Sequence, residues 1–326
     1  MPGFRGRNIT QPMARTSFGK QTQKLLRFLL WAGLLGLRSI LRWMPWNVGL
    51  SLAGGLGAAA YFLLVKERRK ALLHLQLALG GERSSEDRRR IALESFRNLG
   101  RTLFEVLNLN RLTRDKIDRL VRFEGERALK AAAAGGRGVL FVTAHIGNWE
   151  LMGRVVAMHY PLAVVAAPIY DRRVEKIMIG LRAAQGIETL VRDSPGSLKR
   201  LIAMLRRGGV VGLLIDQDTK TDGVFVPFFH QEAFTPTGPA SLAFRTGASV
   251  VVGFIIREGR NRHRIIVHGP LDISSTGQIE RDVRDQTARF TKMIEEQVRK
   301  TPEQWIWMHR RWKKAAERPA GSRPED

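Results

Sequence analysis

Apolar residues dominate two runs near the N-terminus of the chain. The first covers residues 28–37, and the second, from Trp43 to Val65, contains no charged residue across 23 positions. A stretch of that length is long enough to cross a bilayer as a helix. Four glycines weaken it as a helix, and Trp43 and Trp46 suit a membrane interface, so a buried or surface-lying helix stays an alternative.

Basic residues flank these apolar runs on both sides, which also fits a hairpin or a re-entrant helix. Residues 1–27 carry six Lys and Arg and no acid. We therefore predict a basic tail over 1–27 and a membrane-attachment region over 28–70. A main domain is expected over 71–314, followed by a polar, Pro-containing tail over 315–326 that we expect to be disordered.

From Ser84 the apolar positions take on a helical period, with Ser84 and Asp87 as a capping pair. Beyond Gly135, short β-rich runs alternate with helical ones. Strands are expected at 139–143, 162–169, 210–215, 249–256 and 264–267, and helices near 148–158, 173–184, 197–207, 238–246 and 279–299. This alternation predicts an α/β fold with a mixed, mainly parallel sheet flanked by helices.

Charge and composition narrow the partners of this fold. The formal net charge is +24, from 54 Lys and Arg against 30 Asp and Glu. Such a balance favours an anionic partner, which is either nucleic acid, an anionic membrane surface or an acidic carrier protein. The chain has no cysteine, which excludes disulfides, thiolate zinc sites and thiol nucleophiles.

The strongest chemical signal follows the predicted strand 139–143. His145 stands at the carboxyl end of that strand, where reactive groups gather in such sheets, and Glu150 lies in the first turn of the next helix. The Glu150 carboxylate is expected to hold one imidazole nitrogen protonated, leaving the other to accept a hydroxyl proton. Alternatively, His145 caps the strand and Glu150 is an acid favoured by the helix dipole.

Five segments, taken together and in order, resemble the lipid A biosynthesis acyltransferase family, which includes lauroyl and myristoyl transferases. They are Thr143–Glu150, Asp216–Asp218, Val224–Phe229, Thr235–Pro239 and Pro302–Arg311. The resemblance extends to about Lys314 and includes the His-x4-Asp/Glu pattern of glycerolipid-type acyltransferases. Ala144 before the histidine, together with Glu150 in place of Asp, favours the lipid A type over the phospholipid type.

The resemblance implies a fold like that of the glycerolipid acyltransferases and roles for individual residues. His145 would be the general base and Glu150 its partner. The implied substrate-binding residues are Arg182, at the oxyanion or the substrate, together with Asp216, Gln217, Gln304, Trp305, His309 and Arg310. Simpler interpretations remain, in which Arg182 is a solvated cation, Asp216 and Gln217 cap a loop, and Trp305 is a packing aromatic.

The function implied is transfer of an acyl group from an acyl carrier protein thioester to a hydroxyl of an anionic glycolipid, a lipid A precursor. The catalytic domain, residues 71–314, would then act on the cytoplasmic face of an inner membrane among its lipids, with no metal or other cofactor and no nucleic acid. Phosphatidylinositol mannoside or another polar lipid is an alternative acceptor. A non-catalytic basic protein that binds nucleic acid or anionic surfaces is another class, and metal-dependent hydrolysis would need a third ligand beside His145 and Glu150.

Overall fold

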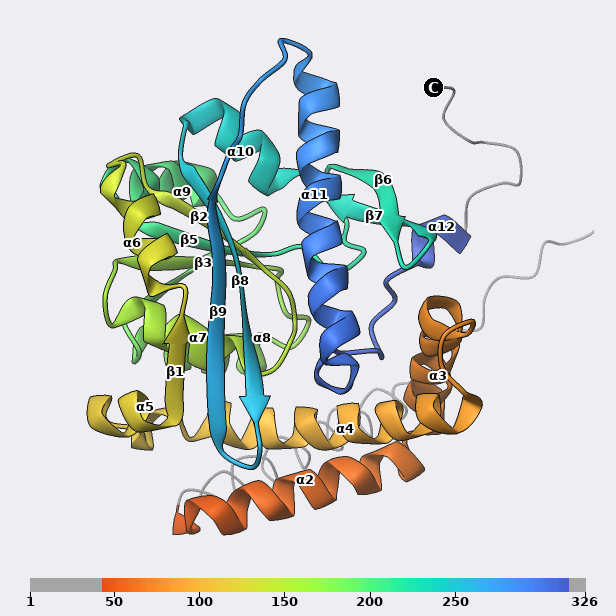
Figure 1. The fold of residues 1–326 in the computed structure, drawn as a ribbon. Helices are drawn as coiled ribbons and strands as arrows, with labels where there is room; N and C mark the ends of the chain where they lie inside the picture. The colour runs from red at the N-terminus through yellow and green to blue at the C-terminus, as the bar shows by residue number, and fades with distance from the viewer. Residues whose placement is uncertain (1–42, 317–326) are drawn as a thin grey trace, which may run out of the picture. The chain divides into compact units, whose positions relative to one another are not determined.

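The computed structural model describes residues 43–316, and the fold is that of the compact unit that begins at Pro45 (Figure 1). The predicted basic tail, the apolar run 28–37 and residues 317–326 lie outside the described residues. Ala315 and Ala316, assigned to the C-terminal tail, end a short helix, α12 (Lys313–Ala316).

A seven-stranded sheet forms the centre of this unit, in the order β1-β9-β8-β2-β5-β3-β4. Its strands are β1 (Val121–Glu124), β2 (Val139–Thr143), β3 (Leu162–Ala166), β4 (Ile187–Val191), β5 (Val210–Leu214), β8 (Ser249–Glu258) and β9 (Arg262–Leu271). All pairings are parallel except the β8–β9 hairpin. The predicted mixed, mainly parallel α/β fold is thus confirmed.

Helices bury both faces of the sheet because successive strand residues point to opposite sides. In β2, Val139 and Phe141 enter one apolar cluster, while Leu140 and Val142 enter the other. The first cluster packs under α5 (Arg114–Leu120), α6 (Glu126–Ala134) and α7 (Trp149–Ala157). The second packs under α9 (Ser197–Arg206), α10 (Gly238–Thr246) and α11 (Ile279–Lys300). The remaining elements are α8 (Arg172–Ala183), the turns η1 (Leu109–Arg111) and η2 (Pro302–Gln304), and a hairpin of β6 (Gly223–Phe228) and β7 (Gln231–Pro236).

Most of the predicted apolar segment Trp43–Val65 forms one helix, α2 (Trp46–Leu63). After Leu64 the chain bends by 89° into α3 (Val65–Leu79). Among the described residues, no helix alone has the length and hydropathy of a membrane span, and α2 and α3 meet that requirement only as a bent pair.

Glycines allow α2 to lie against α4 (Ser85–Leu107), as Figure 1 shows. A Cβ atom at Gly57 would collide with the backbone carbonyl of Phe96. A Cβ atom at Gly100 would collide with the carbonyl of Ala53. The two helix backbones therefore approach more closely than side chains would permit.

Substitution of these glycines tests the close approach of α2 and α4. Gly57→Ala is expected to destabilise the protein by about 1–3 kcal/mol, because the added methyl group must push the helices apart. Gly55→Ala is the matched control, since Gly55 is exposed on the same helix and its Cβ would meet nothing within 4 Å. Thermal unfolding followed by circular dichroism measures both, and equal midpoints would contradict the packing described.

Candidate functional site

Two neighbouring strands bring the central residues of the site together. β2 and β5 are paired in parallel, with Thr143 opposite Leu214, so both strands end at the same edge of the sheet. His145 and Asp216 each follow two residues after these ends. The register of one strand pair therefore places an imidazole beside a carboxylate that is 71 residues away in the sequence.

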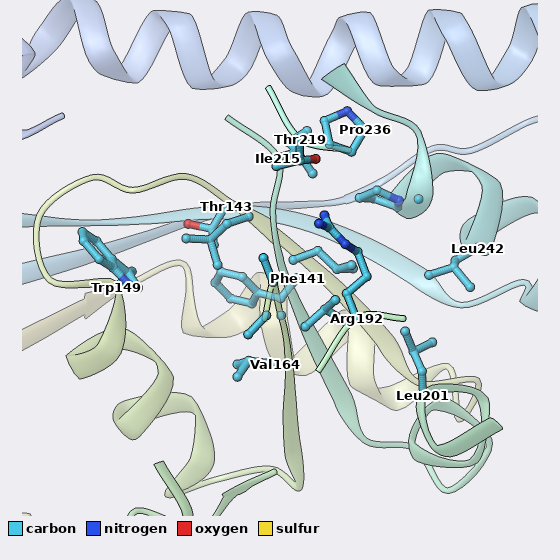
Figure 2. A pocket seen from close by; sticks show the side chains of 18 of the residues that line it. Phe141, Thr143, Trp149, Val164, Arg192, Leu201, Ile215, Thr219, Pro236 and Leu242 are labelled. Atoms are coloured by element: carbon cyan, nitrogen blue, oxygen red, sulfur yellow. The ribbon is translucent and has the colours of Figure 1, made fainter. Parts of the chain in front are cut away.

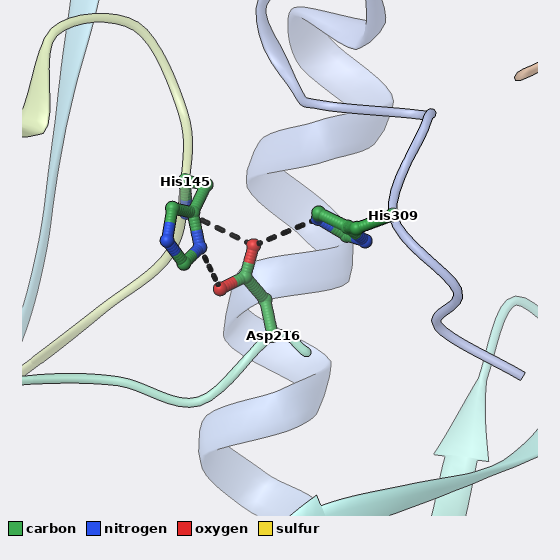
Figure 3. Close-up of side chains that lie close together, drawn as sticks. All are labelled: His145, Asp216 and His309. Carbon is green, nitrogen blue, oxygen red and sulfur yellow. Dashed lines mark hydrogen bonds and ion pairs between the residues drawn. The ribbon is translucent and has the colours of Figure 1, made fainter. Parts of the chain in front are cut away.

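The Asp216 carboxylate is fully buried and accepts three hydrogen bonds. Oδ1 accepts from Nδ1 of His145 at 2.8 Å, and Oδ2 accepts from the His145 backbone N–H at 2.9 Å (Figure 3). Oδ2 also accepts from Trp305 Nε1 at 2.8 Å. Burial opposes ionisation, but the charge and hydrogen bonds of His145 and the nearby charge of His309 outweigh it and hold the pKa of Asp216 well below its usual range. Asp216 is therefore a permanent anion behind the histidine.

This contact decides which nitrogen of His145 can act as a base. The proton on Nδ1 is held by Asp216, so Nε2 carries the free lone pair. The ring of Trp149 packs edge-on against the imidazole at 4.9 Å, and the Gln217 amide lies 3.3–3.4 Å from both ring nitrogens. Asp216, rather than Glu150 as predicted, is the carboxylate that orients His145.

Glu150 instead forms an ion pair with Arg182. Nε of Arg182 lies 3.0 and 3.2 Å from the two carboxylate oxygens, and Nη2 lies 2.6 Å from Oε1. Glu150 sits in the first turn of α7 and Arg182 in the last turn of α8. His145, Glu150 and Arg182 all line the same cavity.

That cavity has a volume of about 640 Å³ and is mainly apolar (Figure 2). One part lies under α7 and is lined by Phe141, Met152, Gly153, Val156, Leu162 and Ile187. Another part reaches α9 and α10 at Leu201 and Leu242, with Arg192, Thr219 and Pro236 also in the wall. The absent side chain of Gly212, between Phe141 and Val164 in the sheet, leaves room here, since a Cβ atom would lie 3.3 Å from Val164.

One face of α4 fixes the loops around the site. Four polar residues, spaced three or four positions apart on this face, each form a hydrogen bond to one of these loops. Ser95 Oγ donates to the Trp305 carbonyl, Asn98 Nδ2 to the Glu303 carbonyl and Thr102 Oγ1 to the Gly147 carbonyl, while Glu105 accepts from Asn148 Nδ2. The loop after β2 and the C-terminal segment are thus attached to the same helix.

Glu105 is the buried anion of this group. Arg257 donates to both of its oxygens at 2.7 Å, and His263 Nε2 lies 3.1 Å away. Although burial opposes the charge, these partners lower the pKa of Glu105 to about 2. Asn148, which bonds to Glu105, also caps α7 by accepting from the Leu151 N–H. Our sequence reasoning missed Glu105, although an acid on the buried face of an amphipathic helix is a usable signal.

The C-terminal residues predicted to bind substrate take different positions. Trp305 is fully buried and bonds to Asp216, and Gln304 binds the backbone N–H and carbonyl of Arg257. His309 Nε2 lies 3.7 Å from Asp216, beyond hydrogen-bond length, and burial lowers the pKa of this imidazole. Arg310 is exposed and lies outside the residues that line the cavity.

The structure also brings together three residues that could bind a metal ion, which the sequence did not predict as a metal site. Ligand atoms of His145, Asp216 and His309 lie within 4.8 Å of one another, a spacing that fits a metal ion. Both Asp216 oxygens, however, already face N–H donors from His145 and Trp305. A metal ion there would have to displace the hydrogen bond between His145 Nδ1 and Asp216 Oδ1, so the geometry is that of a hydrogen-bonded histidine–aspartate pair.

Comparisons with known proteins agree over most of the chain. The model of the bacterial lipid A biosynthesis acyltransferase family matches residues 15–314. The chain is 27% identical to the lipid A biosynthesis palmitoleoyltransferase of Escherichia coli (strain K12) over 299 residues, 90% of this chain and 95% of that protein. It is 29% identical to the lauroyltransferase of the same organism, over 88% and 92%. A phosphatidylinositol mannoside acyltransferase of Mycobacterium tuberculosis (strain CDC 1551 / Oshkosh) is 28% identical, over 68% of this chain and 69% of that protein.

Replacing Glu105 tests the buried network. Glu105→Gln leaves Arg257 without its counter-charge and is expected to cost about 3–5 kcal/mol near neutral pH. Because the folded pKa is about 2 against an ordinary value of 4.5, the contribution of Glu105 is complete above pH 4.5 and is lost as pH falls toward 2. The stability gap between wild type and variant should therefore narrow over that range.

Denaturant unfolding at a series of pH values measures this gap. Glu86→Gln, at an exposed position in the first turn of the same helix, is the control and should leave stability nearly unchanged. A gap between wild type and Glu105→Gln that stays constant from pH 6 down to the acid limit of folding would contradict the network.

Proposed function

The chain belongs to the bacterial lipid A biosynthesis acyltransferase family and is an acyltransferase, and from this premise we propose its donor, acceptor and catalytic residues. The donor is a fatty acyl thioester of acyl carrier protein, and the acceptor is a hydroxyl of a lipid A precursor. The observation that carries the proposal is the His145–Asp216 pair at the wall of an apolar cavity.

His145 acts as the general base of the transfer. Nε2 removes the proton from the acceptor hydroxyl while Nδ1–H stays on Asp216, whose negative charge stabilises the imidazolium that forms. The alkoxide oxygen attacks the thioester carbonyl and forms a tetrahedral oxyanion. When this collapses, the C–S bond breaks and the leaving thiolate takes the proton from Nε2, so no covalent enzyme intermediate is required.

Arg182 stabilises the oxyanion, with Glu150 as its positioning partner. The ion pair engages Nε and Nη2 of Arg182, which leaves Nη1 as the donor for the developing charge. Because the pair joins the first turn of α7 to the last turn of α8, the guanidinium is fixed before substrate arrives. Preorganised donors of this kind lower the barrier without reorganisation during the reaction.

The apolar cavity under α7 holds the acyl chain. The lining under α7 is formed by apolar side chains and Gly153, and the volume of the whole cavity, about 640 Å³, lies in the range of small-molecule sites. Gly153 is one turn beyond Glu150 in α7, and its missing side chain opens the wall toward Ile187 and Leu162. Residue 153 therefore helps to set the chain length that fits.

The acceptor is the less determined of the two substrates. The net charge of +24 suits both an acidic carrier protein and a phosphorylated glycolipid. Phosphatidylinositol mannoside is a second candidate, because a phosphatidylinositol mannoside acyltransferase matches at an identity similar to that of the lipid A enzymes. The wider coverage by lipid A enzymes supports the lipid A precursor as acceptor. The proposed site of the reaction is the cytoplasmic face of an inner membrane.

Loss of either member of the histidine–aspartate pair should abolish turnover. His145→Ala and Asp216→Asn are each expected to lower kcat by about a thousandfold or more, the first by removing the base and the second by removing the charge that orients it. The assay follows radiolabelled acyl transfer from acyl carrier protein to a lipid A precursor in detergent, with phosphatidylinositol mannoside as a parallel acceptor.

His268→Ala, at an exposed position in β9, is the matched control and should keep wild-type activity. Circular dichroism shows whether each variant is folded. Full activity in a folded His145→Ala protein would refute the mechanism. If the wild-type protein is active only with phosphatidylinositol mannoside, that lipid is the acceptor instead of the lipid A precursor.

Filling the cavity at residue 153 should change chain-length preference. Gly153→Leu places a branched side chain against Ile187 and is expected to shift preference toward shorter acyl donors by roughly tenfold in kcat/KM, as one to two methylenes are excluded. The methyl group of Gly153→Ala would lie at ordinary contact distance from Ile187, so this variant should change the chain-length preference little. Competition between donors of different length measures the shift, and an unchanged preference in the Leu variant would contradict this placement.

A further inference from the structure

The outer face of α2 is apolar and exposed. Val48, Leu52 and Leu56 recur at four-residue spacing on the side away from α4, and all three are exposed. The opposite side, with Gly49 and Gly57, is buried. An exposed apolar stripe of this kind marks a surface that contacts lipid or another apolar partner.

A second cavity, of about 270 Å³, opens at the first turn of α2. It is lined by Trp46 and Asn47 of α2, Arg111 and Leu112 after α4, Lys116, Arg119 and Leu120 of α5, and Asn261 in the β8–β9 turn. Figure 1 shows these elements meeting at one end of α2. The cavity shares no lining residue with the catalytic one.

The charged side chains that line this second cavity are all cationic. Three cationic side chains and two carboxamides line it and no acid does, because Asp115 and Asp118 of α5 lie outside its wall. The Arg111 guanidinium lies 5.9 Å from the centroid of the Trp46 ring, so the indole forms one wall beside the charge. Arginine and lysine together with amide donors are the groups that recognise phosphate oxygens.

The cavity and the stripe are continuous along the chain, since Trp46 and Asn47 directly precede Val48. We propose that this corner binds an anionic phospholipid, with its phosphate headgroup in the Arg111–Lys116–Arg119 cavity and its acyl chains along Val48, Leu52 and Leu56. The inference rests on the membrane location in the proposed function. Nucleic acid or an acidic protein would match the cations but leave the apolar stripe in water.

Chemical protection of Lys116 tests the headgroup site directly. The full chain in detergent is titrated with dihexanoylphosphatidylglycerol, dihexanoylphosphatidylcholine or inorganic phosphate, and lysine acetylation is read by peptide mass spectrometry. Lys292, exposed on α11, is the internal reference. The expected result is at least fivefold protection of Lys116 by the phosphatidylglycerol, with Lys292 unaffected.

A charge-matched pair of variants separates a site from general attraction. Arg119→Gln should raise the lipid concentration for half-protection of Lys116 about fivefold, as loss of one cation near an anionic headgroup predicts. Arg284→Gln removes the same charge from an exposed position on α11 and should leave the lipid concentration for half-protection of Lys116 unchanged.

Several outcomes would overturn the proposal. These are equal protection by inorganic phosphate or by the phosphatidylcholine, or no protection at all. The test does not use acyl transfer. If the protein is inactive in the transfer assay but Lys116 is still protected by phosphatidylglycerol, the proposed function is refuted and this inference stands.

Discussion

A single buried carboxylate, that of Asp216, holds the site together. It accepts from the side chain and backbone of His145 and from the indole of Trp305, so the end of β2, the loop after β5 and the C-terminal segment converge on two oxygen atoms. An unpaired buried charge would be costly, but these donors keep Asp216 ionised. The same contacts set the tautomer of His145, and in the proposed mechanism this tautomer makes Nε2 the proton acceptor.

Helix α4 supports this arrangement from outside the sheet. Its inner face carries Ser95, Asn98, Thr102 and Glu105, which bond to the loops that carry the site. Its outer face receives the glycine-rich side of α2, which in turn exposes an apolar stripe. One helix thus joins the surface proposed to meet lipid to the loops that hold the proposed base.

Periodic patterns predicted much of the fold. The central strands β2 and β5 appear as apolar runs because both of their faces are buried, whereas β1 and β4, of four and five residues with partly exposed faces, give too weak a pattern.

His145 was identified from its place after β2. Its partner was assigned wrongly to nearby Glu150, because the contact with Asp216 arises from strand order, with β3 and β4 intervening in sequence. The apolar segment Trp43–Val65 was predicted as a helix, with a re-entrant helix as an alternative, and most of it forms α2; the bend into α3 follows at Leu64.

The central claim is that Asp216 holds His145 as the Nδ1–H tautomer with Nε2 free. Nitrogen-15 NMR of histidine-labelled protein near neutral pH tests it, with His145 assigned by comparison with a His145→Gln protein. The account predicts a protonated Nδ1 with a strongly downfield proton, a deprotonated Nε2, and loss of that downfield proton in Asp216→Asn. A protonated Nε2 with a bare Nδ1 in the wild-type protein would contradict it.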